Sequence, residues 1–588
     1  MFRNLLILAS AALVIGLPFI FQQESALDAW RPGDPVLIVI TPHNEAIRHE
    51  YGRAFSAWHQ EQYGTAVRID WRAIGGTSEI MRYLEAEYTA AFRGAWRRAG
   101  NEWNAEIGRT IVDRRFRPDE PPESLDDTGR AAWERRAAAY RAFRTTDDAS
   151  QFSSQIDLFF GGGEYDHNQV FVRGLTVPPW PEGEAPRELF YGESGRVRFP
   201  EGLSGEIWRT DALFGTALST FGICYNVDRI EDLGIAEPPR RWVDLADPAY
   251  YRQLGLADPT KSGSITKAFE MIIHQQCYDR IRAEGFSDDD IERYEAMIGR
   301  GEDGVPAAYH EALEKGWRDG IALVQRLGAN ARYFTDSASK VPIDVSTGNA
   351  AAGLAIDFYG RYQAQVSQSP RGEERMRYIT PTGGSSVSAD PISLLRGAPN
   401  RELAVRFIRF VLSEEGQKLW NYAPGTPGGP ERFALRRLPI IADFYPQADD
   451  PASKERAARH APFLTDDLSD PDVNPYVLAA QFTYRGRWTG RHFNIHRDLI
   501  RAMCLDSAQE LQAAWEAIID NGGPDANPEA MRLLRRLPDV PYPLNWENIL
   551  GVRREMERLD YMREWTRFFR QSYREAQAAA EAGGVDAG

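Results

Sequence analysis

The sequence predicts an α/β protein in two lobes, with a helical insertion in the first lobe and a mostly helical C-terminal region. Apolar runs of strand length alternate with segments of helical periodicity, an order typical of largely parallel sheets. This alternation occurs twice, on either side of a middle region of small residues. At 588 residues the chain is too long for one hydrophobic core, so two or three compact units are expected.

The composition narrows the function class. Hydrophobic residues make up 43% of the chain and charged residues 26%, as in soluble globular proteins. The net charge of -16 argues against a nucleic acid or an anionic membrane surface as the main partner, because both require clustered Lys and Arg. The three cysteines, Cys224, Cys277 and Cys504, form neither a disulfide framework nor a zinc site, although one pair could bridge in an oxidising compartment.

The first 25 residues resemble an export segment. Arg3 precedes an apolar run from Leu5 to Phe21, which predicts a secretory signal or a short membrane anchor. No convincing small-x-small cleavage site precedes Gln22, so both interpretations stay open. Either one predicts a protein that leaves the cytoplasm.

The first α/β lobe is expected over residues 35–83 and 151–220. Val36–Ile40 predicts a strand, the following residues to Gly64 a helix, "TAVRIDW" a second strand and "IDLFFGGG" a third. Three loops, Thr41–Asn44, Gly75–Ser78 and Gly161–Gly163, fall beyond the carboxyl ends of these strands. Such sheets bind their ligands there.

Residues 84–150 predict a helical insertion in this lobe. Apolar residues from Tyr88 to Ile111 keep a helical face, "RPDEPPESLDDTG" makes a turn, and Trp133, Tyr140 and Phe143 line a returning helix. The many arginines form either a solvated face or a partner surface.

The second lobe, with its hinge strands, is expected over residues 221–425. "TDALFGTALSTFGICYNVDRI" predicts strands that cross between the lobes, and "LGLADPTKSGS" opens a second strand-loop-helix series. Asn400 is expected to cap a helix that carries Leu403 to Leu419. Residues 426–588 alternate Pro-rich loops with helices, among them Asp498 to Ile519, which we expect to pack on the lobes.

The stretch "GLADPTKSGSITK" nearly matches two catalytic motifs. A P-loop requires a second glycine where Thr260 stands, before Lys261 and Ser262. A serine acyl-transferase places its S-x-x-K and K-[ST]-G on separate elements, whereas here both overlap in one loop with Ser264 and Lys267. We therefore expect no enzyme but a helix N-terminus that binds an anion.

Six segments in order resemble the extracellular solute-binding proteins of ABC importers. They are "VLIVITPHNEAIRHEYGRAFSAWHQEQYG", "IDLFFGGG", "TFGICYNVDRI", "LGLADPTKSGS", "AAAGLAIDFYGRYQ" and "AVRFIRFVLSEEGQKLW", and they span about residues 35 to 425. The resemblance is to the branch that binds ferric ion, sugar phosphates, thiamine and polyamines. It implies a type II-like periplasmic-binding-protein fold that closes on a small solute and presents it to a permease, without catalytic residues or a cofactor. It also implies a periplasmic or extracytoplasmic monomer, anchored if the N-terminal segment is retained.

The loops and the resemblance together predict the ligand contacts. The predicted residues are Thr41, His43, Asn44, Gly76, Thr77, Ser78, Gly162, Gly163, Thr220, Asp258, Ser262, Gly263, Ser264, Asp357 and Tyr359. Their hydroxyl groups and glycines favour an anionic organic or phosphorylated metabolite. The alternative is ferric ion, for which the resemblance implies His43, Glu164, Tyr359 and Tyr362, although Phe358 stands where the ferric-ion binders have a second adjacent tyrosine. A sensor or structural module without transport function is the remaining alternative.

Overall fold

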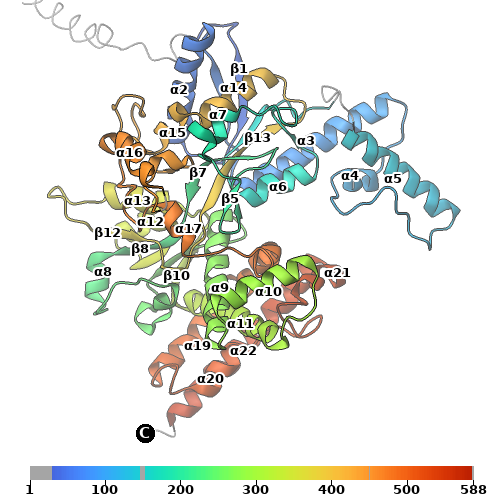
Figure 1. Ribbon diagram of the computed structural model, residues 1–588. Helices are drawn as coiled ribbons and strands as arrows, with labels where there is room; N and C mark the ends of the chain where they lie inside the picture. The colour runs from blue at the N-terminus through green and yellow to red at the C-terminus, as the bar shows by residue number, and fades with distance from the viewer. Residues whose placement is uncertain (1–29, 146–151, 449, 586–588) are drawn as a thin grey trace, which may run out of the picture.

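The computed structural model describes residues 30–145, 152–448 and 450–585. Two mixed sheets form the centres of two α/β lobes, which lie one above the other in Figure 1. The predicted export segment, residues 1–25, lies outside the described residues. Among the helices of the described ranges, none has both the length and the apolar composition needed to cross a bilayer.

The first lobe is built on a sheet in the order β14-β7-β13-β3-β1-β2, with β4 paired to β13. Strand β1 is parallel to β2 and β3, and β13 is antiparallel to β3 and β7. The strands are β1 (Val36–Ile40), β2 (Arg68–Arg72), β3 (Leu158–Phe160), β4 (Thr176–Val177), β7 (Phe214–Ser219), β13 (Ser388–Leu395) and β14 (Leu438–Pro439). The predicted parallel order of the first three strands is present, and their loops leave the sheet at one edge.

Helices cover this sheet, and the longer ones begin directly after its strands. They are α2 (Glu45–Tyr63), α3 (Thr77–Arg98), α6 (Glu164–Val172), α7 (Arg187–Phe190), α14 (Arg401–Leu412) and α15 (Glu414–Asn421), followed along the chain by α16 (Pro451–His460) and α17 (Pro475–Ala480). A hairpin, β5 (Gly202–Leu203) and β6 (Glu206–Ile207), lies beside β13. The apolar faces of α2, α14 and α15 share one core with β1, β7 and β13.

The second lobe has a sheet in the order β10-β9-β11-β8-β12. Its strands are β8 (Phe221–Asn226), β9 (Leu254–Ala257), β10 (Ala331–Thr335), β11 (Ala352–Ile356) and β12 (Met376–Ile379). Its helices are α8 (Val227–Asp232), α9 (Gly263–Ala283), α10 (Asp288–Arg300), α11 (Ala307–Asn330), α12 (Lys340–Ser346) and α13 (Asp357–Val366). The predicted strand-loop-helix unit of "LGLADPTKSGS" is β9 followed by α9.

Two crossings join the sheets. Strand β7 of the first sheet continues through Thr220 into β8 of the second, as predicted, and residues 380–387 lead from β12 back to β13. The hydroxyl of Ser385 accepts a hydrogen bond from the backbone nitrogen of Phe221 at 2.8 Å, so the two crossings are bonded to each other. These two adjacent crossings form the hinge between the lobes.

The insertion begins inside α3 and continues as α4 (Ala105–Ile111) and α5 (Asp127–Thr145). Its base packs on the first lobe, because Phe92 and Phe143 share a core with Ile40 and Phe159 of the sheet. Its outer part extends away from the body of the molecule as an arm (Figure 1).

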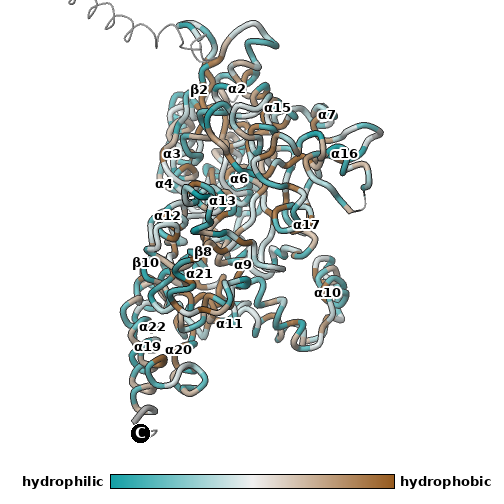
Figure 2. Tube along the Cα trace, turned by 90° about the vertical axis from the view of Figure 1, so that its left-hand side faces the viewer, coloured by the Kyte–Doolittle hydropathy of each residue, from teal (hydrophilic) through white to brown (hydrophobic). Residues whose placement is uncertain are grey.

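The C-terminal region from α18 onward is part of the second lobe, whereas β14 and α17 belong to the first. We call the part from α18 onward the C-terminal region. Its helices are α18 (Phe493–Ile500), a π-helical turn (Arg501–Leu505), α19 (Ala508–Asp520), α20 (Pro528–Leu534), α21 (Val552–Glu555) and α22 (Arg558–Val585). Their apolar side chains belong to the same core as α9 and α11. Both views place α20 and α22 at the end of the molecule opposite α2 (Figures 1 and 2).

Three details differ from the sequence predictions. Strand β13 and helices α14 and α15 lie in the first lobe rather than within a second lobe of residues 221–425, because the chain crosses back after β12. Ser413 divides the predicted helix after Asn400 into two, with its hydroxyl accepting from the nitrogen of Gly416 at 3.3 Å. The predicted helix from Asp498 to Ile519 is likewise interrupted by the π-helical turn.

Candidate functional site: the cleft between the lobes

The three predicted loops of the first lobe meet beyond β1, β2 and β3. Gly161 and Gly162 have φ angles of +96° and +108°, which favour glycine. A methyl group on Gly161 would lie 2.5 Å from Nε2 of His43, and one on Gly162 would lie 2.2 Å from Cγ2 of Thr77. Glycines in the third loop therefore allow His43 of the first loop and Thr77 of the second loop to pack closely against it.

The loop after β9 brings the second lobe to the same place. A methyl group on Gly263 would lie 3.5 Å from Oγ1 of Thr77 and 3.7 Å from Oδ2 of Asp166. One on Gly76 would lie 3.5 Å from the carbonyl oxygen of Lys261. The first turns of α3, α6 and α9, two from one lobe and one from the other, thus lie against each other.

The three helices differ in how their first turns are capped. The hydroxyl of Ser262 accepts from the nitrogen of Ile265 at 3.3 Å and caps α9. The N-cap residues of α3 and α6 are Gly76 and Gly163, and glycine has no side chain that could cap a helix. First-turn N–H groups of these two helices are therefore without a side-chain cap, and the helix dipole makes that end attractive to negative charge.

Asp166 already carries a carboxyl group into this junction. It is buried, with 8% of its surface exposed. Burial raises the pKa of Asp166, while the hydroxyl of Thr77 and the positive charges of Arg497 and Arg173 act in the opposite direction. The sequence analysis did not select Asp166, although it stands in the first turn after the predicted glycine loop.

A second group of charges lies beneath His43. Its Nε2 is 3.2 Å from Oδ2 of Asp390, which also pairs with the buried guanidinium of Arg437. Arg437 donates to the hydroxyl of Ser219 at 3.0 Å and lies 4.3 Å from the ring centre of Phe358 in the second lobe. Burial lowers the pKa of His43, and the charge of Arg437 together with the hydrogen bond from His43 holds the pKa of Asp390 well below its ordinary value despite burial. His43 is therefore held by an ion pair at the hinge.

A third group joins the lobes under α9. Nζ of Lys267 lies 3.1 Å from Glu206 of the β5–β6 hairpin, 3.3 Å from Glu270 and 3.5 Å from the ring centre of Tyr484. Burial lowers the pKa of Lys267, but these carboxylates raise it well above its usual value and so favour the protonated amine. Burial and the same carboxylates raise the pKa of the nearby Glu164 to about 7.

Several predicted ligand residues have local structural partners instead. The hydroxyl of Thr41 accepts from the nitrogen of His43 at 3.0 Å, and Asn44 caps α2 through the nitrogen of Ile47 at 3.1 Å. Thr220 bonds Thr380 at 3.1 Å in the hinge. These side chains shape the loops that surround the cleft.

The two predicted aspartates of the second lobe are also engaged. Asp258 accepts from both the backbone nitrogen and the hydroxyl of Thr260, at 2.8 Å and 2.6 Å, and pairs with Arg501 at 2.8 Å. Asp357 accepts from the nitrogen of Phe358 at 2.7 Å and from Arg361 at 3.1 Å. Asp258 therefore fixes the loop before α9, and Asp357 fixes the start of α13.

The two tyrosines of the predicted ferric-ion set lie in different environments. Tyr359 is half-buried and packs on Phe358, with ring centres 4.2 Å apart and ring planes tilted by 45°, whereas Tyr362 is 44% exposed. Phe358, not a tyrosine, takes the position facing Arg437. Within the described ranges, no group of three or more His, Cys, Asp or Glu side chains is placed to hold a metal ion.

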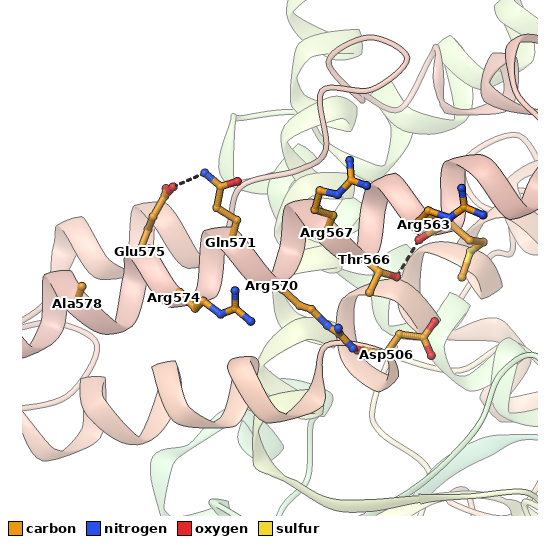
Figure 3. Close-up of a pocket in the computed structure, with 10 residues that line it drawn as sticks. Asp506, Arg563, Thr566, Arg567, Arg570, Gln571, Arg574, Glu575 and Ala578 are labelled. Atoms are coloured by element: carbon orange, nitrogen blue, oxygen red, sulfur yellow. Dashed lines mark hydrogen bonds between the residues drawn. The ribbon is translucent and has the colours of Figure 1, made fainter.

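A groove of about 1040 Å³ runs along α22, far along the chain from the predicted loops (Figure 3). Arg563, Arg567, Arg570 and Arg574 line it in a row, with Asp506 beside them. Arg567 pairs with Glu564 at 2.9 Å and Arg574 with Glu510 at 2.9 Å. The row is largely neutralised by neighbouring acids, as on a solvated helix face.

The sequence analysis missed cleft residues that come from distant parts of the chain. Arg497 of α18 donates to the hydroxyl of Ser78 at 3.2 Å and to the carbonyl oxygen of Pro259 at 2.7 Å. Arg437 and Tyr484 reach the groups described above. No local pattern around these residues marks them, because the chain folds back over more than 200 residues to place them there.

Comparison with known proteins finds a family match in the central part of the chain, over less than half of its length. Residues 208–456 match the model of the bacterial extracellular solute-binding protein family. This match agrees with the family resemblance of the ordered segments, and it covers the hinge, β8 to β13 and the loop before α9.

More distant relatives were found along larger parts of the chain. An uncharacterized protein of Haemophilus influenzae is 22% identical over 272 residues, which are 46% of this chain and 62% of that protein, so the match spans less than two thirds of the relative. Among solved structures, AfuA of Actinobacillus pleuropneumoniae with fructose-6-phosphate is 15% identical, covering 78% of this chain and 98% of its own, with a TM-score of 0.41. The spermidine/putrescine-binding PotD of Streptococcus pneumoniae is 13% identical, covering 79% and 99%, with a TM-score of 0.41.

Proposed function

We propose that this protein captures a small solute with an anionic group, such as a phosphate or carboxylate, between its lobes and delivers it to an ABC permease. The observation that supports this is the meeting of α3, α6 and α9 across the two lobes. A solute bound at this junction would contact both lobes at once, and closure would bury it. The protein acts outside the cytoplasm as a monomer without a cofactor.

The anionic preference follows from the helix ends. Each first turn offers N–H groups and the positive end of a helix dipole, and a negative group near such an end gains typically about 0.3–1 kcal/mol per helix. Thr77 and Ser264 add hydroxyl groups at α3 and α9. In this interpretation Asp166 competes with the solute, because its own carboxyl group lies at the junction.

The test measures binding to the full chain by calorimetry, with inorganic phosphate, a sugar phosphate, a polyamine and ferric citrate as probes. We expect the phosphate-containing probes to bind and Asp166→Asn to tighten that binding up to about tenfold, or about 1.4 kcal/mol, because a competing charge is removed. Ser264→Ala should weaken it.

A matched control distinguishes a local effect from a general change in charge. Asp289→Asn removes the same charge from the first turn of α10, where the side chain is exposed. It should leave phosphate affinity unchanged. Binding of ferric citrate or the polyamine alone, or no change in Asp166→Asn, would contradict the anionic assignment, and no binding of any probe would contradict solute capture at this site.

A further inference from the structure

The C-terminal region, carried by the second lobe, touches the first lobe across the cleft. Helix α18 is fixed to the second lobe by Ile495 and Leu499 in its core and by a hydrogen bond of 2.9 Å from Trp317 to His496. Its other face carries Asn494 and Arg497, three residues apart and therefore neighbours on a helix. These two side chains reach the first lobe.

The contact is specific in its hydrogen bonds. Nε of Arg497 donates to the carbonyl oxygen of Pro259 in the second lobe at 2.7 Å, and Nη2 donates to Oγ of Ser78 in the first lobe at 3.2 Å. Nδ2 of Asn494 donates to Oη of Tyr165 in the first lobe at 2.6 Å, and the ring of Tyr165 lies 5.1 Å from that of Phe493. We call these residues of both lobes, Ser78, Tyr165, Asn494 and Arg497, the latch.

We propose that the latch holds the lobes closed, with Arg497 as the positioning residue that joins them. The guanidinium suits this role because its planar fork presents separate donors in fixed directions to two acceptors. When the first lobe turns about the hinge away from the second, Ser78 and Tyr165 move off with it while α18 stays with the second lobe. Opening therefore breaks the latch, and removing the latch favours the open state.

Arg501, one turn further along the chain, provides a matched control. It pairs with Asp258 at 2.8 Å, bonds Thr260 at 3.2 Å and pairs with Asp506 at 3.4 Å. All three partners belong to the second lobe or to the C-terminal region that it carries. Arg501→Ala thus removes an arginine from the adjoining π-helical turn without removing any of these contacts across the cleft.

The test measures the distance between the lobes without a solute. The three native cysteines are buried, so dyes can be attached at Glu61→Cys in α2 and Arg371→Cys in the loop before β12, both exposed positions in different lobes. Single-molecule energy transfer in the full-length protein then reports open and closed populations. We expect Arg497→Ala to raise the open-to-closed ratio about fivefold to tenfold, as the loss of hydrogen bonds from a charged donor predicts.

Two further variants separate the bridge from its charge. Arg497→Lys keeps the positive charge but not the fork, so it should also open the lobes, although less. Ser78→Ala removes the acceptor from the first lobe, and combined with Arg497→Ala it should add little to the effect of Arg497→Ala alone. Arg501→Ala should leave the distance distribution unchanged.

The latch is overturned if Arg497→Ala and Ser78→Ala both keep the wild-type distance distribution, or if Arg501→Ala opens the lobes as much as Arg497→Ala. A wild-type distribution in Arg497→Lys would overturn the bridging role. The latch depends on the proposed capture of a solute only for its role in transport. A protein that opens on loss of Arg497 but binds none of the probes would retain the latch and lose the proposed function.

Discussion

The helical insertion and the C-terminal region are both additions of helices, yet they relate to the lobes in different ways. In the outer part of the insertion, Trp133 is half-buried and packs on Phe116 at 4.6 Å between ring centres. In the C-terminal region, Trp565 is fully buried in a core shared with α9 and α11. The insertion is thus an arm attached at its base, whereas the C-terminal region is part of the second lobe and moves with it.

The largest expected effect tests this difference with two tryptophans. Trp565→Ala should lower the free energy of unfolding by about 3–5 kcal/mol, because it leaves a cavity in a packed core and removes the hydrogen bond of 3.0 Å from its indole to the carbonyl oxygen of Val540. Trp133→Ala should lower it by about 1 kcal/mol, since its side chain is half-buried before the change. Urea unfolding of both variants provides the measurement.

Equal losses in the two variants would show that the arm is as strongly integrated as the C-terminal region. A loss of stability confined to Trp565→Ala, together with a change in the near-ultraviolet circular dichroism, would sharpen the distinction. It is expected because the C-terminal region and the second lobe share one core and fold together.

The next effect compares two aspartates. Asp498 of α18 is buried and accepts hydrogen bonds from Arg553, Arg558 and Tyr561 at 2.8, 2.7 and 2.6 Å. Asp119 of the arm pairs with Arg141, and its side chain is 80% exposed. Asp498→Asn should cost about 2 kcal/mol at neutral pH, and Asp119→Asn less than about 0.5 kcal/mol.

The pH dependence gives this comparison a second measurement. Although burial raises the pKa of Asp498, its donors outweigh burial and hold the pKa below its ordinary value. A depressed folded-state pKa means that the contribution is present above the unfolded-state pKa and is lost as pH falls through the folded-state pKa. The difference between wild type and Asp498→Asn should therefore shrink on acidification below pH ~4. A difference that stays constant down to that range would contradict the assigned cause.

The sequence predicted the two-lobed α/β order well because its signals are local. Apolar runs such as Val36–Ile40 and the glycines that follow "IDLFF" depend on neighbours within a few residues. The return of β13 to the first sheet could not be predicted in this way, because its local sequence does not indicate which of the two sheets it joins. The chain crosses back to the first sheet after β12.

In the candidate site, too, residues marked by local signals were predicted and residues placed by distant contacts were not. Gly76, Thr77, Gly162 and Gly263 were predicted from the ends of strands, and the structure brings them together. Asp258 and Asn44 were selected for the same reason, but their short side chains bond nearby backbone groups, a competition that sequence does not resolve. Arg497 could not be found at all, since its partners Ser78 and Pro259 lie 419 and 238 residues away.

The smallest expected effect is on the free energy of unfolding when an exposed arginine is removed, and it should be alike in the arm and in the C-terminal region. Arg567 of α22 pairs with Glu564 at 2.9 Å, and Arg141 of the arm pairs with Asp119 at 2.6 Å. Both arginines are about half or more exposed, so water and salt screen each pair, and replacing either arginine by alanine should change the free energy of unfolding by less than about 0.5 kcal/mol. Urea unfolding at low and high salt checks both. A clearly larger and salt-dependent loss in Arg567→Ala would mean that the arginine row of α22 stabilises the C-terminal region electrostatically. Burial in the shared core would then no longer be sufficient to explain why that region, and not the arm, belongs to the lobe.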